Sequence, residues 1–281
     1  MALRINGPGA VQTYRLQQRD QQLAMSLTRL SSGSKLNRAA DGPAALIINN
    51  QLRTQLEALG QATDNITQGI GMARTAEGGL EQIQDLLQQQ RNLAVQAQSS
   101  ATVDADQLKA LDKQFQSLGK AIDSLASGTQ YAGTKLLDGS FTGRQIQTGQ
   151  EAGQTVELSI TSSASGTPAG FDQAGLGTSG QSLLGAGGAT AALEAIDKAL
   201  TDVGQQRGAL GALESNSLDS LRNSLAETSA NLAGARSTIG DVDYAEEFSG
   251  LVRNQILMQS AIAARAQQNV SAGSVMKLLG G

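Results

Sequence analysis

Apolar side chains recur alternately after three and four positions along much of this sequence, and this spacing limits the possible folds more than any other feature. In residues 56–97 the spaced positions are Leu56, Leu59, Thr63, Ile66, Ile70, Ala73, Leu80 and Leu87, with polar residues at Glu77 and Gln84. A repeat of about 3.5 residues places such side chains on one face of a helix, which then packs along a neighbouring helix. We therefore expect one long helix that ends near Ala97.

Two further segments carry the same spacing. After a polar break at residues 99–104, it continues through Leu108, Leu111, Phe115, Leu118, Ile122 and Leu125, which predicts a second helix folded back on the first. A third helix is expected from about Thr190 to Ile239, with Leu193, Ile196, Leu200, Val203 and Leu210 followed by Leu218, Leu221, Leu225, Leu232 and Ala235. The second set is displaced by four residues, a stutter that unwinds a coil locally without ending the helix.

The composition supports helices packed in narrow seams and excludes several functions. Aromatic residues make up 2% of the chain, so Leu, Ile, Val and Ala must supply the core. The sequence contains no Cys and no His, which removes disulfides, thiolate nucleophiles, imidazole bases and the commonest strong zinc ligands. We expect no enzyme and no cofactor. The formal net charge is -4, without a Lys/Arg cluster, and no apolar run approaches a membrane span, so we expect neither nucleic-acid binding nor membrane insertion.

The middle of the chain has a different texture. Apolar and polar residues alternate in residues 141–147 and again in residues 155–160, with glycines beside them, which predicts a small β-hairpin. Residues 162–188 are rich in Gly, Ser and Ala and almost uncharged, which predicts an exposed loop or weakly ordered cap. This β/Gly-rich element is expected at about residues 138–188.

Each end of the chain is an amphipathic segment separated from the middle by a helix breaker. On the N-terminal side, the break is Asp41-Gly42-Pro43, where Asp41 is expected to cap the next helix and Pro43 to occupy its first turn. On the C-terminal side, Gly240 breaks the pattern, and Asp243 with Glu246 three residues later predicts a new helix start. We call these end segments the N-terminal and C-terminal arms.

The arms predict the architecture and a way of assembling. The expected fold is mainly α, with long antiparallel coiled-coil helices from both termini. One domain comprises residues 1–44 with 240–281, and a helical rod domain comprises residues 45–239. Two helices cannot cover an apolar stripe on all sides, so the arms require neighbouring copies to order fully. The predicted contacts are Leu16, Leu23, Leu27, Leu30, Leu251, Met258, Ile262, Leu278 and Leu279; which of these face the other arm and which face another copy is left open.

Several sequence blocks in the predicted helices resemble one known family. The N-terminal blocks are Leu30-Ser31-Ser32-Gly33, Asn37-Arg38-Ala39-Ala40-Asp41, residues 68–80 (QGIGMARTAEGGL) and residues 91–96 (RNLAVQ). The C-terminal blocks are residues 239–247 (IGDVDYAEE), residues 255–257 (QIL) and residues 266–269 (AQQN). These blocks closely resemble both end regions of bacterial flagellins, in the family order, and the likeness spans nearly the whole chain.

The resemblance implies a short flagellin with core domains only, which polymerises into the extracellular flagellar filament for swimming motility. It also implies export without a cleaved signal peptide, and partners that comprise further copies, other flagellins, an export chaperone, and hook-junction and cap proteins. A hook-filament junction protein of the same fold, present in few copies, is an alternative. A coiled-coil signalling module is another, although the membrane helix or sensor domain that such modules need is not apparent.

The resemblance also suggests a degenerate receptor patch. An innate immune receptor senses many flagellins at a patch that reads Arg-x-Arg-Glu-Leu in strongly sensed relatives, with a Glu on the opposing helix. In this chain Gln89, Arg91 and Leu93 fall on that patch, and Gln114 falls near the opposing Glu. Because the charge-assisted pairs are lost, we expect weaker receptor binding.

Overall fold

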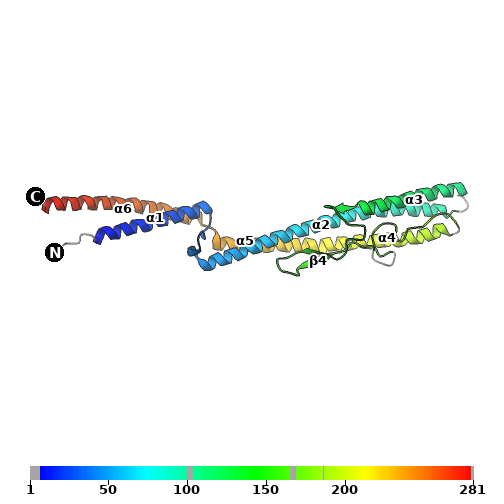
Figure 1. Cartoon of the computed structure of the whole chain (residues 1–281), viewed down its shortest axis with the longest axis horizontal. Helices are drawn as coiled ribbons and strands as arrows, with labels where there is room; N and C mark the ends of the chain where they lie inside the picture. Colours follow the sequence, from blue (N-terminus) through cyan, green and yellow to red (C-terminus); the bar gives the residue numbers. More distant parts are fainter. Residues whose placement is uncertain (1–6, 100–103, 165–168, 186, 280–281) are drawn as a thin grey trace. The chain divides into compact units, whose positions relative to one another are not determined.

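The computed structural model describes residues 7–99, 104–164, 169–185 and 187–279, and the chain divides into two compact units. The terminal unit comprises Met1–Leu56 with Ala230–Gly281, and the middle unit comprises Glu57–Ser229. The elements are α1 (Gly7–Ser32), the 3-10 turn η1 (Ala39–Asp41), α2 (Pro43–Ala97), α3 (Ala105–Gly128), β1 (Gln130–Tyr131), β2 (Thr134–Lys135), β3 (Arg144–Gln147), β4 (Thr155–Leu158), α4 (Gly188–Ala212), the π-helical turn η2 (Leu213–Leu218), α5 (Asp219–Gly240) and α6 (Tyr244–Leu279) (Figure 1). The mainly helical fold with a small hairpin is confirmed.

The core of the middle unit lies between α2, α3 and α4. The spaced residues of α2 are buried as expected, among them Ile66, Leu80 and Leu87, each with no exposed surface. Leu80 and Leu87 pack with Phe115 and Ile122 of α3 in one cluster that extends to α4, whereas Ile66 belongs to a smaller cluster with Ile70 and Leu218. The helix begins at Pro43, as the Asp41-Gly42-Pro43 break indicated, because a proline in the first turn favours helical backbone angles and needs no N–H partner.

The stutter expected in the third helix is present as the π-helical turn η2, but the displacement differs from the prediction. The seam of α4 is formed by small and branched residues, namely Ala189, Ala192, Ile196, Ala199, Val203 and Leu210, while Leu193 and Leu200 lie half-buried beside it. Continuing that spacing would bury Ser217, yet the buried residue is Leu218. The displacement is therefore one residue, not four, and a π turn accommodates the extra residue.

The start of α3 is fixed by a capping box. Asp104 Oδ1 accepts the backbone N–H of Gln107 at 2.8 Å, and Gln107 Oε1 accepts the backbone N–H of Asp104 at 3.3 Å. These two bonds satisfy backbone N–H groups at the start of the helix, for which the helix itself provides no carbonyl acceptor. The polar break in the sequence is thus a helix start with a specific cap.

Replacing Asp104 with alanine is expected to lower the free energy of unfolding by about 1 kcal/mol, because the first-turn N–H groups lose their acceptor. Urea unfolding followed by circular dichroism measures the change. Asp106→Ala is the matched control, because the exposed Asp106 only pairs with Lys109 on the same helix, worth about 0.2–0.5 kcal/mol. Equal losses in the two variants would contradict the capping role.

The predicted hairpin forms between β3 and β4, which pair antiparallel with Ile146 opposite Val156. A second, two-residue hairpin of β1 and β2 was not expected. Its turn residues Ala132 and Gly133 both have positive φ, at 47° and 83°, as a tight hairpin turn requires. Alanine seldom adopts this conformation, so the sequence carries no strong turn signal there.

The expectation of an exposed loop after the hairpin was wrong for residues 169–185. Phe171, Leu176 and Leu183 are buried in the main core, at 0%, 1% and 1% exposure. Carboxylates of α3 hold the segment: Asp123 accepts the backbone N–H of Gln173 at 2.9 Å, and Asp112 accepts that of Leu183 at 2.8 Å. The segment therefore completes the core of the middle unit. Residues 165–168 and 186 lie outside the described part.

Candidate assembly surface

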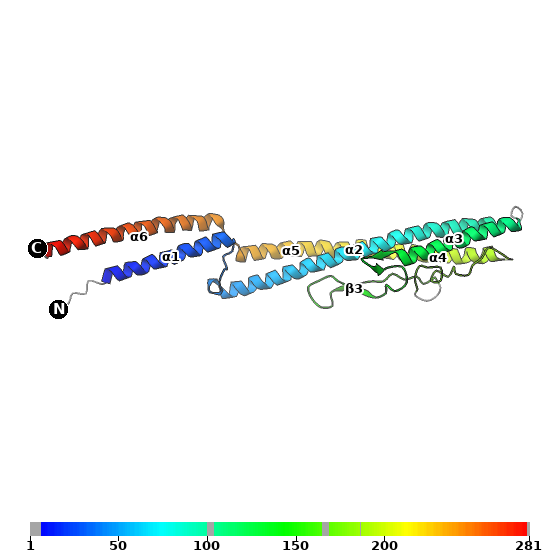
Figure 2. The same ribbon diagram turned by 45° about the horizontal axis from the view of Figure 1, so that its top comes forward.

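In the terminal unit, α1 and α6 lie side by side and run antiparallel (Figures 1 and 2). Their shielded residues include Leu251, with 6% of its surface exposed, and Leu16, Leu23, Leu30 and Met258, which are half-buried. We call this set the inter-arm seam. The structure thus brings five of the predicted contact residues to the shielded side of the arm pair.

The other predicted contacts do not belong to the seam. Leu27 and Ile262 are exposed, at 49% and 55%. The side chains of Leu278 and Leu279, at the end of α6, lie outside the described part of the structure. The predicted set therefore contains both shielded and exposed residues.

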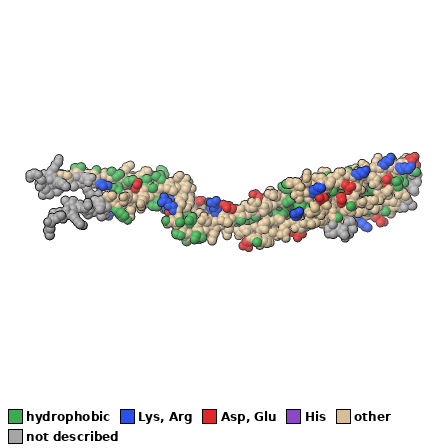
Figure 3. All heavy atoms as spheres, in the orientation of Figure 1, with side chains coloured by type: hydrophobic (Ala, Val, Ile, Leu, Met, Phe, Trp, Pro, Cys, Tyr) green, Lys and Arg blue, Asp and Glu red, His purple; other side chains and the backbone are tan. Residues whose placement is uncertain are grey.

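A row of large exposed side chains runs along α6 at intervals of four residues. It consists of Tyr244, Phe248, Val252 and Ile256, exposed by 58%, 59%, 37% and 58%. Residues spaced by four form a ridge on a helix, which fits the groove of another helix. Phe248, Val252 and Ile256 also line a shallow surface groove with Arg253 and Leu257. Figure 3 shows hydrophobic side chains at the surface of the described parts of α1 and α6. We call these four residues the α6 ridge.

The second turn of α2 adds two more exposed apolar residues. Ile47 and Ile48 are 59% and 45% exposed and belong to the same unit as the arms. Sequence reasoning missed both them and the α6 ridge, because it followed the single face that contains Leu251 and Met258. The available signal was the four-residue spacing from Tyr244 to Ile256.

The segments that follow α1 and α5 are joined by a short antiparallel bridge between Ser34 and Asp241. The Lys35 N–H donates to the Gly240 carbonyl at 2.7 Å, and the Val242 N–H donates to the Gly33 carbonyl at 3.0 Å. Gly33 has a φ of 70°, which glycine adopts without strain. The bridge ties the ends of both arms together within the terminal unit.

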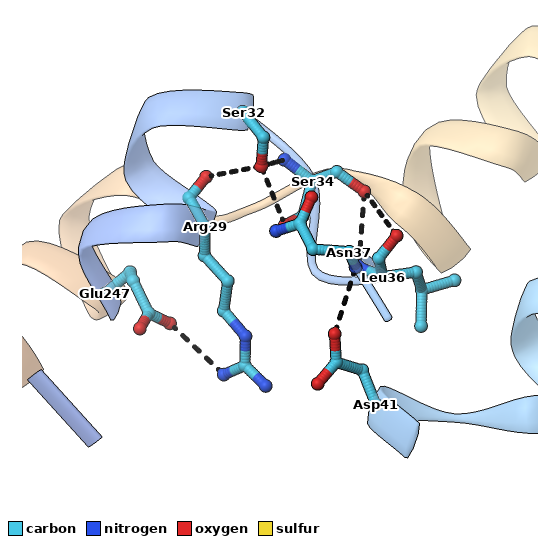
Figure 4. Close-up of polar contacts among 7 residues, drawn as sticks. All are labelled: Arg29, Ser32, Ser34, Leu36, Asn37, Asp41 and Glu247. Carbon is cyan, nitrogen blue, oxygen red and sulfur yellow. Dashed lines mark hydrogen bonds and ion pairs between the residues drawn. The ribbon is translucent and has the colours of Figure 1, made fainter. Parts of the chain in front are cut away.

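Side chains reinforce the loop after α1 (Figure 4). The Ser34 hydroxyl accepts the Leu36 N–H at 3.2 Å and also lies 3.2 Å from the Gly240 carbonyl, to which it donates. Arg29 Nη1 of α1 lies 3.8 Å from Glu247 Oε2 of α6, a long ion pair of two partly shielded groups. Such a pair adds little stability by itself but favours the antiparallel alignment.

Of the two aspartates predicted to cap helices beside the bridge, one caps its helix and the other does not. Asp243 caps α6 as expected, because its Oδ1 accepts the N–H groups of Ala245 and Glu246 at 2.9 and 3.1 Å. Asp41 does not cap α2: its Oδ2 accepts the N–H groups of Asn37 and Arg38, at 3.0 and 2.7 Å. The 3-10 turn η1 folds the carboxylate back towards the preceding loop, away from the start of α2.

The described ranges lack a clustered metal site. They contain no group of three or more acidic, Cys or His residues that could hold a metal ion. Nor do they contain a helix with the length and apolar character needed to cross a membrane.

Comparison with known proteins agrees with this geometry. The family model for the bacterial flagellin N-terminal helical region matches residues 6–142, and the model for the C-terminal helical region matches residues 193–279. The flagellin of Halalkalibacterium halodurans is 36% identical over 256 residues, covering 90% of each chain. This chain belongs to the bacterial flagellin family.

Other relatives of this flagellin agree. The flagellar filament 30.7 kDa core protein of Treponema maltophilum is 32% identical over 270 residues, with 92% of each chain covered. A solved putative flagellar hook-associated protein from Vibrio parahaemolyticus shares the fold, with a TM-score of 0.54 over 72% of this chain and all of that one, at 17% identity. This flagellin is a structural subunit of the flagellar filament.

The predicted receptor patch of this flagellin is only partly assembled. Gln89 and Leu93 of α2 and Gln114 of α3 line one shallow hollow, together with Asn92, Ser117 and Leu118. Arg91 instead pairs with Asp197 of α4, with Nε 2.7 Å from Oδ1. The hollow is therefore a neutral surface of amides and leucines, and Arg91 is engaged on another face.

Proposed function

We propose that this flagellin polymerises through its terminal unit, and that the two apolar faces of the arms have different tasks. The inter-arm seam holds α1 against α6 within one subunit. The α6 ridge, with Ile47, Ile48 and Ile262, contacts neighbouring subunits. Each copy then presents the α6 ridge to one neighbour and a different surface patch to another. Contacts between two different patches produce an open helical filament when the rotation from copy to copy does not close into a ring.

The exposed α6 ridge is the observation that carries the proposal. Large apolar side chains at intervals of four residues resemble the interior of a helix bundle more than the surface of a soluble monomer. Burying one such side chain between subunits contributes about 1.5–3 kcal/mol to the free energy of their association. A contact repeated in every subunit therefore gives the filament much of its cohesion.

Substitution of one ridge residue tests the proposal. Ile256→Asp is expected to weaken addition of subunits to filament seeds roughly 10- to 100-fold, because each 1.4 kcal/mol lost is a factor of ten in affinity. Light scattering gives the growth rate and the critical concentration. Gln259→Asp, at an exposed polar position on the same helix, is the matched control and should assemble normally. Equal growth of the two variants would sink the assignment of the ridge.

Membership in the family supports proposals for the remaining roles. The filament is extracellular, and we propose that other flagellins, an export chaperone, and hook-junction and cap proteins are further partners. Export without a cleaved signal peptide stays a prediction, which N-terminal sequencing of filament protein would check. The likeness to a hook-associated protein concerns the fold alone. Copy number in purified flagella distinguishes a filament subunit from a junction protein.

We also propose that the innate receptor binds this flagellin weakly at the hollow lined by Gln89, Leu93 and Gln114. The hollow keeps the leucine but presents only neutral amides around it. The double variant Gln89→Arg with Gln114→Glu should raise receptor activation by at least roughly tenfold, since two charge-assisted contacts of about 1.5–3 kcal/mol each become possible. A reporter-cell assay measures it, with Arg91→Gln as a control that changes little. Full activation by the unmodified protein would refute the proposal.

A further inference from the structure

The π-helical turn η2 lies where the core of the middle unit is divided. On one side is the main cluster, which extends from Ala73 to Leu210, and on the other is a small cluster of Ile66, Ile70 and Leu218. Leu213, inside η2, packs against both clusters. The extra residue of the turn therefore falls at the junction of two separately packed sets of side chains.

The helix leading into η2 contains more glycine than its packing requires. Gly204, Gly208 and Gly211 follow one another at short intervals, and a Cβ added at any of them would meet no heavy atom within 4 Å. Glycine inside a helix is less favourable than alanine, because the unfolded backbone has more freedom to lose. Since no close contact demands these glycines, their effect is to weaken the helix beside the turn.

One ion pair crosses from α2 to the turn. Arg74 Nε and Nη2 lie 2.8 and 2.6 Å from Glu214 Oε1. The arginine side chain is 65% exposed, so water competes for the pair. This surface pair joins η2 to α2 in addition to the packing of Leu213 and Leu218.

We propose that η2 is a flexible joint within the middle unit, at which the α4–η2–α5 helix opens and bends while the cores on both sides stay packed. Three features combine there: a π turn that interrupts the α-helical hydrogen-bond pattern, three dispensable glycines, and a break between core clusters. In the filament, such a joint lets a subunit adjust its middle unit to its neighbours. That last role depends on the proposed polymerisation, but the joint itself does not.

Deleting Asn216 tests the joint in the monomer. Asn216 is exposed within η2, and its removal places Leu218 seven residues after Leu210, so an uninterrupted α-helix keeps both clusters in register. Hydrogen exchange at residues 212–219 of the unmodified protein is expected to be at least tenfold faster than at residues 195–203, and the deletion should slow it at least tenfold. Asn216→Ala, which keeps the chain length, should leave the fast exchange unchanged.

Two results would overturn the proposal of a joint. One is slow hydrogen exchange at η2 in the unmodified protein. The other is loss of folding in the deletion variant, which would disprove the one-residue displacement. Glu214→Gln provides a second variant that needs no register change. It should speed exchange in η2 several-fold and leave residues 195–203 unaffected. Filaments of the deletion variant should be at least twofold longer in persistence length than those of Asn216→Ala, by electron microscopy. Equal stiffness would refute the role in the filament without affecting the monomer result.

Discussion

Removing residues 1–40 or residues 245–281 is expected to abolish growth on filament seeds. Each truncation deletes one side of the inter-arm seam and exposes the other side, including Leu251 or Leu16 and Leu23. The remaining arm cannot offset the cost of ordering, about 1–2 kcal/mol per residue, without its partner. Seeded assembly followed by electron microscopy measures the effect.

The control for this experiment is the fold of the middle unit, whose main core extends from Ala73 to Leu210 and contains no arm residue. Circular dichroism should therefore show a cooperative thermal transition in both truncated proteins. If either truncation product still elongated seeds at a normal rate, the terminal unit would not be the polymerising element. If both failed while the middle unit unfolded normally, the loss would be specific to assembly.

Gly139→Ala is expected to cause a large loss of stability from a single methyl group in the middle unit. A Cβ at Gly139 would lie 2.6 Å from the Gly170 backbone nitrogen and 2.8 Å from the Ala169 carbonyl carbon, where no flexible side chain can move away. The residue also has a φ of 83°, which alanine adopts with strain. We expect a loss of about 3 kcal/mol or more in urea unfolding.

Gly133→Ala separates the effect of the close backbone contact from the effect of the positive φ. Gly133 has the same φ of 83°, but a Cβ there meets nothing within 4 Å. The free energy of unfolding of this variant should fall only by the cost of the backbone strain, about 1 kcal/mol. Similar losses at Gly133 and Gly139 would mean that residues 169–170 do not pack closely against the loop of Gly139.

The helices were predictable because one physical signal determines them. The repeat from Leu59 to Leu87 specifies which face of α2 is buried, and the breakers at Gly240 and Asp243 specify where the C-terminal arm starts. The packing of residues 169–185 was not predictable, because Phe171, Leu176 and Leu183 are isolated apolar residues without a period. What holds that segment is a set of bonds from Asp112 and Asp123 to its backbone, which no local pattern reveals.

The assembly surface was predictable only in part. Periodicity identified an apolar face on α6 with Leu251 and Met258, but the helix has a second such face along Phe248 and Ile256. Sequence alone does not say which face the other arm covers. Arg91 shows the same limit, because its pairing with Asp197 depends on how α4 lies beside α2.

The terminal unit joins residues 1–56 to residues 230–281, and this has a consequence for the order of synthesis. Ribosomes add about 5–20 residues per second, so roughly 10 to 35 seconds separate the end of the first part from the start of the second. Throughout that interval the apolar face of α1 is made but its partner α6 does not yet exist. The nascent N-terminal arm is therefore the stretch most exposed to premature association in the cell, and the time that it spends alone is determined by the length of the middle unit.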